Sequence, residues 1–479
     1  MKFPTTAVLN ILATALACGF ARAADTPVTP AWRERHDQLV ARLRALAPKE
    51  GDFGAAYQPL YHAAISWYEL WGGRNPNPVD DFMVSPDTYA AELAASLEQE
   101  RNYFADNPSA LFPLVFRETL PNGEALDANY WLSLPAGFPT AGRRFPLFIQ
   151  LHGSGWLGHK ISFTRGKGPA GPGFAVTPID MDGPWKIEFL NAYLDELITM
   201  LPIDTDRVYV SGHSLGGMAT WEWALNNPWR FAAIAPTAGI GEPYRAIRLK
   251  NLPAWVIHGE KDDVVPNGFA DEMVTAMQAC GAPVRYSLIR GGPHNMPADM
   301  DSGQILEWYL RQTRSPLSAP PDPRDALGLN ADGYSPVELI TQPATPSWQS
   351  APLGAVDEYG ARATAALLFK KVHERGELVD APLRVEWDRA TNISTMWLAV
   401  PRTLHPFGPV DPSIIVIPAS HYYRFYYRGT ADKLTDHLKS VQCELEAEGH
   451  ALSGKVWMTH LSIWWDTRAA ISECWVEAR

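Results

Sequence analysis

A serine between glycines interrupts a strongly apolar run at residues 207–217, RVYVSGHSLGG. The β-branched and aromatic residues before it predict a buried strand, and the stretch after it is compatible with a helix. At a sharp strand-to-helix turn, Gly212 and Gly216 would allow tight backbone packing, and the hydroxyl of Ser214 would project above the sheet. The motif predicts a sheet covered by helices and makes Ser214 a candidate nucleophile.

The surrounding region repeats this pattern of a predicted strand followed by a predicted helix. Two apolar stretches around Asn122-Gly123 have the form of paired strands, and six apolar runs after them, including the one before Ser214, alternate with amphipathic stretches up to residue 314. Such alternation is typical of a parallel sheet with helices on its faces. We therefore predict an α/β domain over residues 112–314, built on a doubly wound, mostly parallel sheet.

The N-terminus has the features of an export signal. Lys2 precedes a short apolar stretch, and Ala-Arg-Ala at 21–23 supplies a cleavage pattern. We expect residues 1–23 to be a signal peptide cut near Ala23/Ala24, which implies a periplasmic or secreted protein. Residues 24–111 show helical spacing of apolar side chains and predict a helical extension without a recognisable chemical motif.

Charge and hydropathy limit the possible partners. The net charge is −12, and the chain contains no long basic run. This argues against nucleic acid and against an anionic membrane surface as the main partner. No segment after the signal is long and apolar enough to cross a membrane, so we expect no membrane span.

The C-terminal third has a different organisation. Residues 315–333 are rich in proline and predict a linker. Residues 334–479 contain two stretches in the order β-α-β-β, which predict an α+β domain with one curved sheet around a cup, unless the shared order is coincidental. Outside the signal, Cys280, Cys443 and Cys474 form an odd set, so Cys443 and Cys474 either pair or remain free thiols.

A serine nucleophile needs a base and an acid that orients the base. On a sheet of this type both follow the serine in chain order, in loops after later strands. Asp262 and Asp263 follow one predicted strand, and His294 follows the next. His258 is interpreted as a structural residue at a strand end. We expect His213, within the serine motif, to point elsewhere.

The oxyanion that forms during acyl transfer also needs donors. His152-Gly153-Ser154-Gly155 follows an earlier predicted strand. We expect the N–H of Gly153 or Ser154, together with the N–H of Leu215, to form the oxyanion hole. Trp156 and Trp185 lie in loops at the same face and predict an aromatic-lined pocket. This chemistry requires neither a metal nor an organic cofactor.

These residues carry a resemblance to a known group. Residues 145–311 resemble the α/β-hydrolase superfamily, and within it the secreted carboxylesterases that include feruloyl-esterase-like, polyhydroxybutyrate-depolymerase-like and "predicted peptidase" proteins. The resemblance lies in LHGSG, in VYVSGHSLGG, in HGEKDDVVP and in GGPHN. It implies that Asp262, at the fifth position of the third motif, is the acid rather than Asp263. It also implies that His294 is the base, although proline replaces the more familiar glycine before it.

The C-terminal repeat resembles a second group. YYRFYYRGTADKLTDHL and the closing ISECWVEAR are similar to gyrase-inhibitor-like effector-binding domains, which hold small organic molecules in a cup. The resemblance implies a possible second small-molecule ligand here. It makes Glu473 a candidate ligand contact, although an ordinary polar strand residue is an equal alternative.

Three functions follow from these patterns. The leading hypothesis is a serine carboxylesterase that acts through an acyl-enzyme on a small-molecule or oligosaccharide-linked ester, either aromatic (feruloyl-type) or short-chain. The first alternative is a peptidase or amidase with the same triad, because a fold does not separate amides from esters. The second alternative is a secreted small-molecule-binding protein with an inert hydrolase domain.

Overall fold

The computed structural model describes most of the chain after residue 28. The described residues are 29–49, 52–71, 86–108, 110–119, 125–153, 171–179, 185–295, 302–353, 358–391, 393–401, 404, 412–461 and 471–479. The predicted signal peptide lies outside them, as do Ser154 and Trp156.

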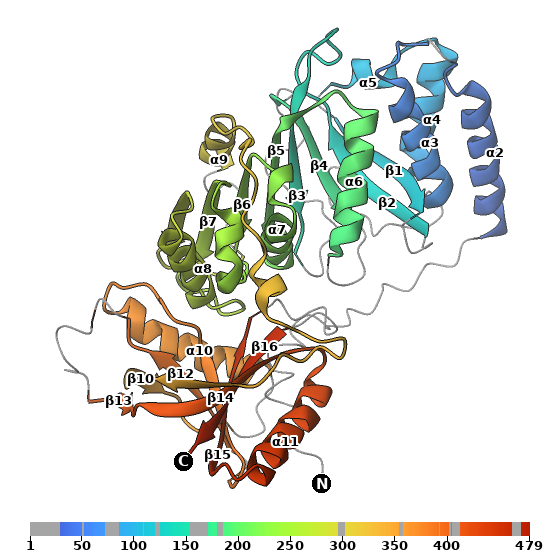
Figure 1. The fold of residues 1–479 in the computed structure, drawn as a ribbon. Coiled ribbons are helices and arrows are strands. Elements are labelled where there is room, and N and C mark those ends of the chain that lie inside the picture. The colour runs from blue at the N-terminus through green and yellow to red at the C-terminus, as the bar shows by residue number, and fades with distance from the viewer. Residues whose placement is uncertain are drawn as a thin grey trace.

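The central part of the chain forms an eight-stranded sheet in the order β1-β2-β4-β3-β5-β6-β7-β8 (Figure 1). The strands in the run β4-β3-β5-β6-β7-β8 are parallel to one another, whereas β2 pairs antiparallel with β1 and with β4. The predicted mostly parallel sheet is therefore confirmed. Its strands are β1 (Leu111–Thr119), β2 (Ala125–Ser133), β3 (Phe145–Leu151), β4 (Phe174–Ile179), β5 (Ile203–His213), β6 (Ala233–Thr237), β7 (Ala254–Gly259) and β8 (Val284–Ile289).

Helices cover both faces of this sheet. Alternate residues of β5 enter different cores: Val208 and Val210 belong to the larger core, and Tyr209 packs with Tyr309 of α9 on the opposite face. This period-two burial on two apolar faces is why the strand sequence is almost continuously apolar. The helices are α6 (Ile187–Met200), α7 (Leu215–Asn226), α8 (Gly268–Ala279) and α9 (Ser302–Tyr309), with short 3₁₀ turns η1 (Pro228–Arg230), η2 (Pro243–Leu249) and η3 (Pro323–Ala326).

The N-terminal extension is helical and extends the larger core. Its helices are α2 (Pro30–Leu46), α3 (Gln58–Trp71), α4 (Pro86–Glu98) and α5 (Tyr103–Asp106). The indole N–H of Trp67 in α3 donates to Asn129 of β2 over 2.9 Å, and Phe104 packs edge-on against Phe112 of β1. The extension therefore lies beyond the β1 edge of the sheet, away from the C-terminal domain (Figure 1).

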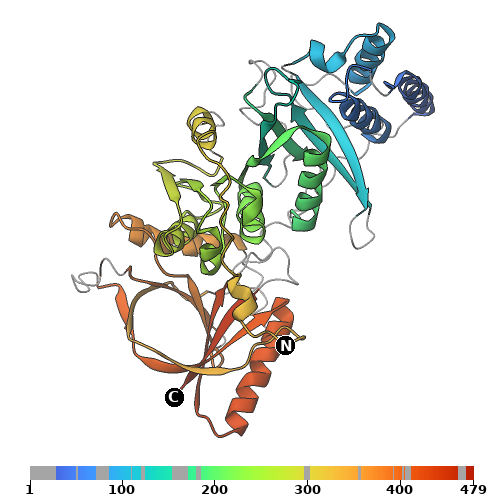
Figure 2. The ribbon, with the colours of Figure 1, turned by 45° about the horizontal axis from the view of Figure 1, so that its top comes forward.

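The described part of the C-terminal domain is a second, fully antiparallel sheet with two helices. Its order is β13-β10-β12-β11-β15-β16-β14-β9, and it curls into a nearly closed ring (Figure 2). Each predicted half gains a strand, because a long expected strand divides into β9 and β10, or into β13 and β14. The elements are β9 (Glu338–Gln342), β10 (Thr345–Gln349), α10 (Glu358–His373), β11 (Arg384–Asp388), β12 (Ile393–Ala399), β13 (Ile414–Ile417), β14 (Ser420–Arg428), α11 (Ala431–Ala447), β15 (Leu452–His460) and β16 (Ile471–Ala478).

The sheet order supports an internal repeat. Exchanging each strand of the first half with its counterpart, β9 with β13 and β11 with β15, reproduces the same order read from the other end. The central pair is β11 and β15, one from each half, and the short first strand of each half borders the other half. The two halves therefore build one continuous sheet.

The two domains meet along α8. The ring of Phe369 in α10 packs against Gly268 and Phe269, and His373 bonds to the buried carboxylate of Asp271. The proline-rich segment is also held, because Asp322 accepts a hydrogen bond from the fully buried guanidinium of Arg245 over 2.5 Å. At each of these two contacts, a buried charged group, Asp271 or Arg245, bonds to a residue from a later part of the chain.

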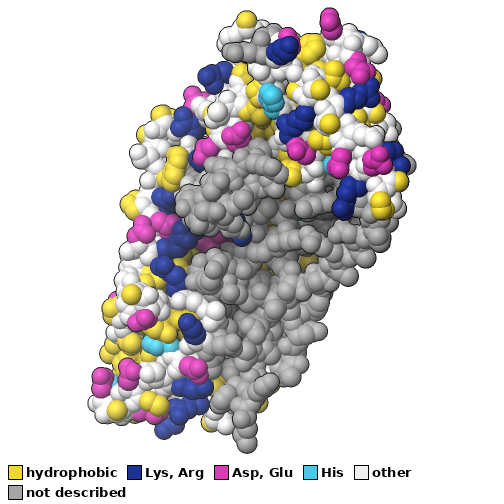
Figure 3. All heavy atoms as spheres, turned by 90° about the vertical axis from the view of Figure 1, so that its right-hand side faces the viewer, with side chains coloured by type: hydrophobic (Ala, Val, Ile, Leu, Met, Phe, Trp, Pro, Cys, Tyr) yellow, Lys and Arg dark blue, Asp and Glu magenta, His cyan; other side chains and the backbone are white. Residues whose placement is uncertain are grey.

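Three further findings concern the chain as a whole. None of the helices in the described ranges is long and apolar enough to span a bilayer. The cysteines at 280, 443 and 474 are free thiols, so the alternative of a pair between the last two is not realised. On the described part of the face in Figure 3, basic and acidic side chains are interspersed rather than gathered by sign.

Candidate active site

Ser214 sits on a strained turn between β5 and α7. It has φ 56° and ψ −119°, in a region that non-glycine residues rarely adopt. Its N–H donates to Thr237 at the end of β6 over 2.9 Å, which ties the turn to the neighbouring strand. The side chain is 8% exposed, so the hydroxyl is nearly enclosed.

Close backbone contact explains the glycine at 216. A Cβ there would lie 2.1 Å from the carbonyl oxygen of Leu151 in β3, a distance that no side chain can tolerate. The first turn of α7 therefore packs directly on the end of β3. This packing holds Ser214 at the carboxyl end of the parallel strands, where such sheets place their sites.

His294 and Asp262 complete a hydrogen-bonded chain with Ser214. Nε2 of His294 lies 2.9 Å from Oγ of Ser214, and Nδ1 lies 2.9 and 2.8 Å from the two carboxylate oxygens of Asp262. Because a carboxylate only accepts, the Nδ1–H of His294 donates to Asp262 and leaves Nε2 free to accept the serine proton. All three side chains are buried. Asp263 is exposed and lies outside this chain.

The acid is held by more than the base. Oδ1 of Asp262 accepts the N–H groups of Val264 over 3.0 Å and Val265 over 2.7 Å, and Nε2 of His258 lies 3.2 Å from Oδ2. Burial alone would raise the pKa of Asp262, but hydrogen bonds from His258 and His294 outweigh it and hold this pKa well below its usual value. Asp262 is therefore a carboxylate throughout the ordinary pH range.

Two further histidines, His258 and His213, contact residues of the hydrogen-bonded chain, which the sequence did not indicate. His258 is indeed buried at a strand end, but it contacts the carboxylate of Asp262. The expectation that His213 points elsewhere is wrong, because its Nε2–H donates to the carbonyl of His294 over 2.8 Å and its ring lies 4.8 Å from the His294 ring. The spacing of four between His258 and Asp262 was a visible signal, whereas the contact of His213 depends on a loop 81 residues away.

The expected oxyanion donors are partly described. A Cβ on Gly153 would lie 3.3 Å from Cβ of Ser214, so the end of the β3 loop borders the nucleophile. Leu215 is the first residue of α7, and its N–H therefore has no carbonyl within its own helix to bond. Gly153 and Leu215 are therefore both next to Ser214, one in space and one in sequence.

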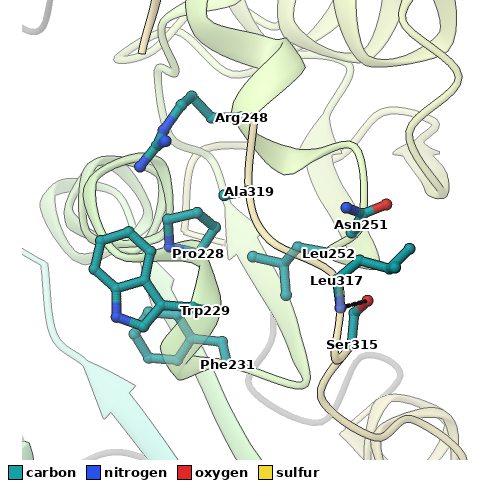
Figure 4. Close-up of a pocket in the computed structure, with 9 residues that line it drawn as sticks. All are labelled: Pro228, Trp229, Phe231, Arg248, Asn251, Leu252, Ser315, Leu317 and Ala319. Carbon is teal, nitrogen blue, oxygen red and sulfur yellow. Dashed lines mark hydrogen bonds between the residues drawn. The ribbon is translucent and has the colours of Figure 1, made fainter. Parts of the chain in front are cut away.

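Trp185 packs against the start of this loop, at His152. It is 2% exposed, its indole N–H donates to the carbonyl of His152 over 3.3 Å, and the two rings lie 4.8 Å apart. Trp185 therefore packs beneath the loop and does not present a face to an open pocket. A shallow depression beside Trp229 and Leu317 lies at the opposite end of α7 from Ser214 (Figure 4).

The other candidate residue, Glu473, lies in the C-terminal sheet. Its carboxylate accepts the hydroxyl proton of Tyr426 over 3.2 Å and lies 3.8 Å from the guanidinium of Arg424. The structure therefore places Glu473 among polar residues of β14. Among the described residues, no group of three or more His, Cys, Asp or Glu is arranged to hold a metal ion.

This sheet, with a serine turn after β5, an acid after β7 and a histidine after β8, has the α/β-hydrolase fold. No protein-family profile matches the chain. Its curated relatives are esterases and cutinases. Cutinase 2 of Thermobifida cellulosilytica is 28% identical over 203 residues, 37% of this chain and 71% of the cutinase. The bifunctional acetylxylan esterase/xylanase XynS20E of Neocallimastix patriciarum is 30% identical over 93 residues, 19% of this chain and 14% of that protein.

The similarity is local. A thermostable esterase of known structure shares 25% identity and a TM-score of 0.36, over 42% of this chain and 63% of that one. The chain spans less than half the length of two of the curated relatives that it matches. The matches therefore cover less than half of this chain, and the C-terminal domain is argued from its own residues.

Proposed function

We propose that this protein is a serine carboxylesterase in which Ser214, His294 and Asp262 are the catalytic triad. The observation that carries the proposal is the continuous chain from the Ser214 hydroxyl through His294 to Asp262, with donor–acceptor distances of 2.9 Å or less. Similarity to esterases and cutinases supports the same class of reaction.

The geometry suits a two-step acyl transfer. Nε2 of His294 takes the proton from Ser214 as Oγ attacks the ester carbonyl, and Asp262 stabilises the imidazolium that forms. His294 then protonates the departing alcohol, which leaves the acyl group on Ser214. Water attacks the acyl-enzyme by the same route and releases the acid.

We propose the N–H of Leu215 as one oxyanion donor and an N–H of the loop at Gly153 and Ser154 as the other. The first position adjoins the nucleophile, and Gly153 lies within van der Waals reach of Ser214. Loss of one such donor typically costs about 3–4 kcal/mol of transition-state stabilisation. The hole therefore supplies a large share of the expected rate enhancement.

The proposed substrate is a carboxylic ester of a small molecule or of an oligosaccharide. Both aromatic and short-chain acyl groups remain candidates. The buried position of Trp185 removes one reason to favour aromatic acyl groups, since its indole supports the loop at His152. The relative rates on matched esters will decide between these acyl classes.

The test is hydrolysis of p-nitrophenyl acetate, butyrate and octanoate and of methyl ferulate by the wild type and by Ser214→Ala. The mutant should lose on the order of 10⁴–10⁶ in turnover. Ser211→Ala is the matched control, because Ser211 lies three residues earlier, on β5, and its hydroxyl donates to Gln150 rather than to His294. It should retain most of the activity.

A peptide amide paired with an ester of the same acyl group separates the alternatives. Faster cleavage of the amide would make the protein a peptidase with the proposed triad. A wild type as inactive as Ser214→Ala on every ester and amide would contradict the proposed hydrolase and would favour the binding protein.

For the C-terminal domain we propose a small-molecule site on the inner face of its sheet. Directly paired residues on neighbouring strands share a face of the sheet. Trp397 pairs with Arg384, and Trp457 pairs both with Glu386 and with Trp475. Since Arg384 and Glu386 are two residues apart on β11, all three tryptophans lie on one face. The three indole N–H groups are buried and have no hydrogen-bond partner within the described parts of the chain. Buried donors are normally paired, so a bound group with acceptor atoms would satisfy them.

Charged side chains add to this face. One oxygen of Glu386 bonds to Lys455 over 2.7 Å, and its other oxygen is buried without a partner among the described residues. Arg384 lies over the ring of Trp475 at 3.9 Å, and Glu473 lies further along the same strand. The proposed ligand is therefore a flat organic molecule with acceptor atoms and one donor or positive group.

Calorimetric titration of the Ser214→Ala protein with ferulate and with the flat aromatic cation N-methylquinolinium tests this site. Trp457→Phe should weaken the binding of ferulate by removing a donor, and Glu386→Gln should weaken the binding of the cation. The Trp457→Phe variant also distinguishes this site from the hydrolase site, where Trp457 plays no part. The proposal fails if neither probe binds, or if both variants bind both probes as the parent does.

We also propose that the protein is exported, with cleavage before Ala24. The sequence of residues 1–23 supports this location. Expression with the native N-terminus in a Gram-negative host should give a periplasmic product. Its intact mass should equal that of a chain that starts at Ala24. Full-length product confined to the cytoplasm would contradict export.

A further inference from the structure

We propose that His213, the second residue of the serine motif, is a positioning residue that fixes the main chain of His294. The inference rests on the proposed function and adds to it a residue outside the triad. Its basis is the 2.8 Å hydrogen bond from Nε2 of His213 to the carbonyl oxygen of His294.

The contact is specific in direction. A carbonyl only accepts, so Nε2 of His213 carries the hydrogen, and Nδ1 has the lone pair in the neutral ring. Burial is the main influence on this ring and, with the nearby imidazole of His294, lowers the pKa of His213 despite opposing contributions from the carbonyl and from Asp262. The ring is therefore neutral at neutral pH. Its N–H group is directed at the loop after β8 that carries His294, residues 290–295, which we call the base loop.

The base loop has few other anchors near its histidine. Lys261 N–H bonds to the carbonyl of Gly292 over 2.8 Å, and Gly259 approaches the carbonyls of Gly292 and Pro293 so closely that a Cβ would lie 2.4 and 2.6 Å away. These contacts end one residue before His294, and Pro293 has no N–H to donate. For the main chain of His294 itself, His213 provides the bond within the described residues.

His213 also joins three parts of the site. Its own main chain leads into Ser214, its ring lies 4.8 Å from the His294 ring, and a Cβ on Gly153 would lie 3.6 Å from its Nδ1. One partly buried side chain thus contacts the nucleophile turn, the base loop and the loop of the proposed oxyanion donors. A displacement of about 1 Å at such a position can cost on the order of 100-fold in rate.

The consequence is a defined distance between Nε2 of His294 and Oγ of Ser214. Without the bond from His213, the carbonyl of His294 would lose a buried donor, and the loop would reach the productive position only part of the time. We expect little effect on substrate binding, because the bond from His213 acts on the position of the base. The loss should therefore appear in kcat rather than in KM.

The test compares three substitutions. His213→Gln places an amide nitrogen at the same number of bonds from Cβ as Nε2 and can donate to the carbonyl. His213→Asn places its amide at the position of Nδ1 and cannot reach. His213→Phe keeps the ring without a donor. We expect kcat to fall roughly 10- to 100-fold for Phe and Asn, with KM little changed, and to recover substantially for Gln.

Labelling with a fluorophosphonate gives a readout that does not depend on the substrate. The rate of modification of Ser214 should fall in parallel with kcat for His213→Phe and His213→Asn, at melting temperatures close to that of His213→Gln. If Phe prevents folding, the Gln and Asn pair carries the comparison. The inference is overturned if Gln and Asn behave alike, or if activity follows only the loss of thermal stability.

The labelling experiment also separates the two proposals. A wild type that neither hydrolyses esters nor reacts with the fluorophosphonate refutes the proposed hydrolase. A wild type that does both, with variants that retain its rates, refutes only the role of His213.

Discussion

Asp262 binds His294 with both of its carboxylate oxygens, at 2.9 and 2.8 Å from the same Nδ1 atom. The arrangement fixes the ring orientation and assigns the proton to Nδ1, which keeps Nε2 available to Ser214. Because His258 and two main-chain N–H groups hold the carboxylate in turn, the acid is itself positioned.

The first prediction concerns this acid. Asp262→Asn should lower kcat by about 10⁴, because an amide can donate to Nδ1 and thereby favour the tautomer that cannot accept the serine proton. Ester hydrolysis at neutral pH measures the effect. Asp263→Asn is the neighbouring control and should behave as the wild type, since Asp263 is exposed and outside the triad. Equal losses for the two variants would refute the assignment.

The second prediction concerns pH and stability at the same residue. The pKa of Asp262 is lower in the folded than in the unfolded protein, so the contribution of its carboxylate to stability is present above the unfolded value of about 4 and lost as the pH falls below it. Denaturant unfolding measures the free energy of unfolding of the wild type and of Asp262→Asn between pH 2 and 6, roughly the range in which carboxyls titrate. Plotted against pH, the two free energies should converge as the pH falls. Parallel curves would contradict the prediction.

The third prediction concerns Glu272 in α8. Burial is the main cause that raises its pKa from 4.5 to about 8, and the nearby charge of Asp271 adds to the effect, while the N–H of Leu383 opposes it. Between these values the folded protein holds a proton that the unfolded protein has lost, so stability decreases as the pH rises.

Glu272→Gln should remove this dependence. The side chain keeps some contact with solvent, so we expect a gain on the order of 1–2 kcal/mol at pH 8, declining to zero near pH 4. Thermal unfolding across this range measures it. Glu307→Gln on the exposed face of α9 is the control and should leave the pH dependence unchanged. A gain that is independent of pH would contradict the assigned pKa.

The fourth prediction concerns packing under the nucleophile. Gly216→Ala should destabilise the protein by roughly 1–3 kcal/mol or more, because its Cβ would overlap the carbonyl of Leu151. Gly303→Ala is the matched helical control, since a Cβ there meets no atom within 4 Å. The control should be neutral or slightly stabilising. Similar melting temperatures for the two variants would refute the close approach of α7 to β3.

The fifth prediction concerns the segment between the domains. Arg245 is fully buried and bonds to Glu242 over 2.7 Å and to Asp322 over 2.5 Å. Arg245→Ala should therefore cost about 3–5 kcal/mol, because it removes one member of a buried charge network. Limited proteolysis should then detect release of the segment around Asp322. Arg311→Ala, at an exposed pair, should change neither readout.

Much of the site follows from local sequence. The motif at 212–216 implies a turn, because only glycine permits the contact that the structure places at Gly216. Asp262 and His294 follow strands that sequence patterns identify, and parallel strands bring such loops to one edge. The second sheet was also foreseeable from its repeated order, although the division of its long strands was not, because edge pairing between the two halves decides where each strand ends.

The sequence alone determined the order of elements, the chemistry of the candidate triad and the place of each member after a strand, because these depend on local pattern and on chain order. The tertiary structure decided which histidines contact the triad and where the tryptophan at 185 points. His213 and His294 are 81 residues apart, and their contact exists only because β5 and β8 belong to one sheet. Long-range packing selects among orientations that local sequence leaves equally accessible, since the free energy of a side chain depends on the partners it meets when buried.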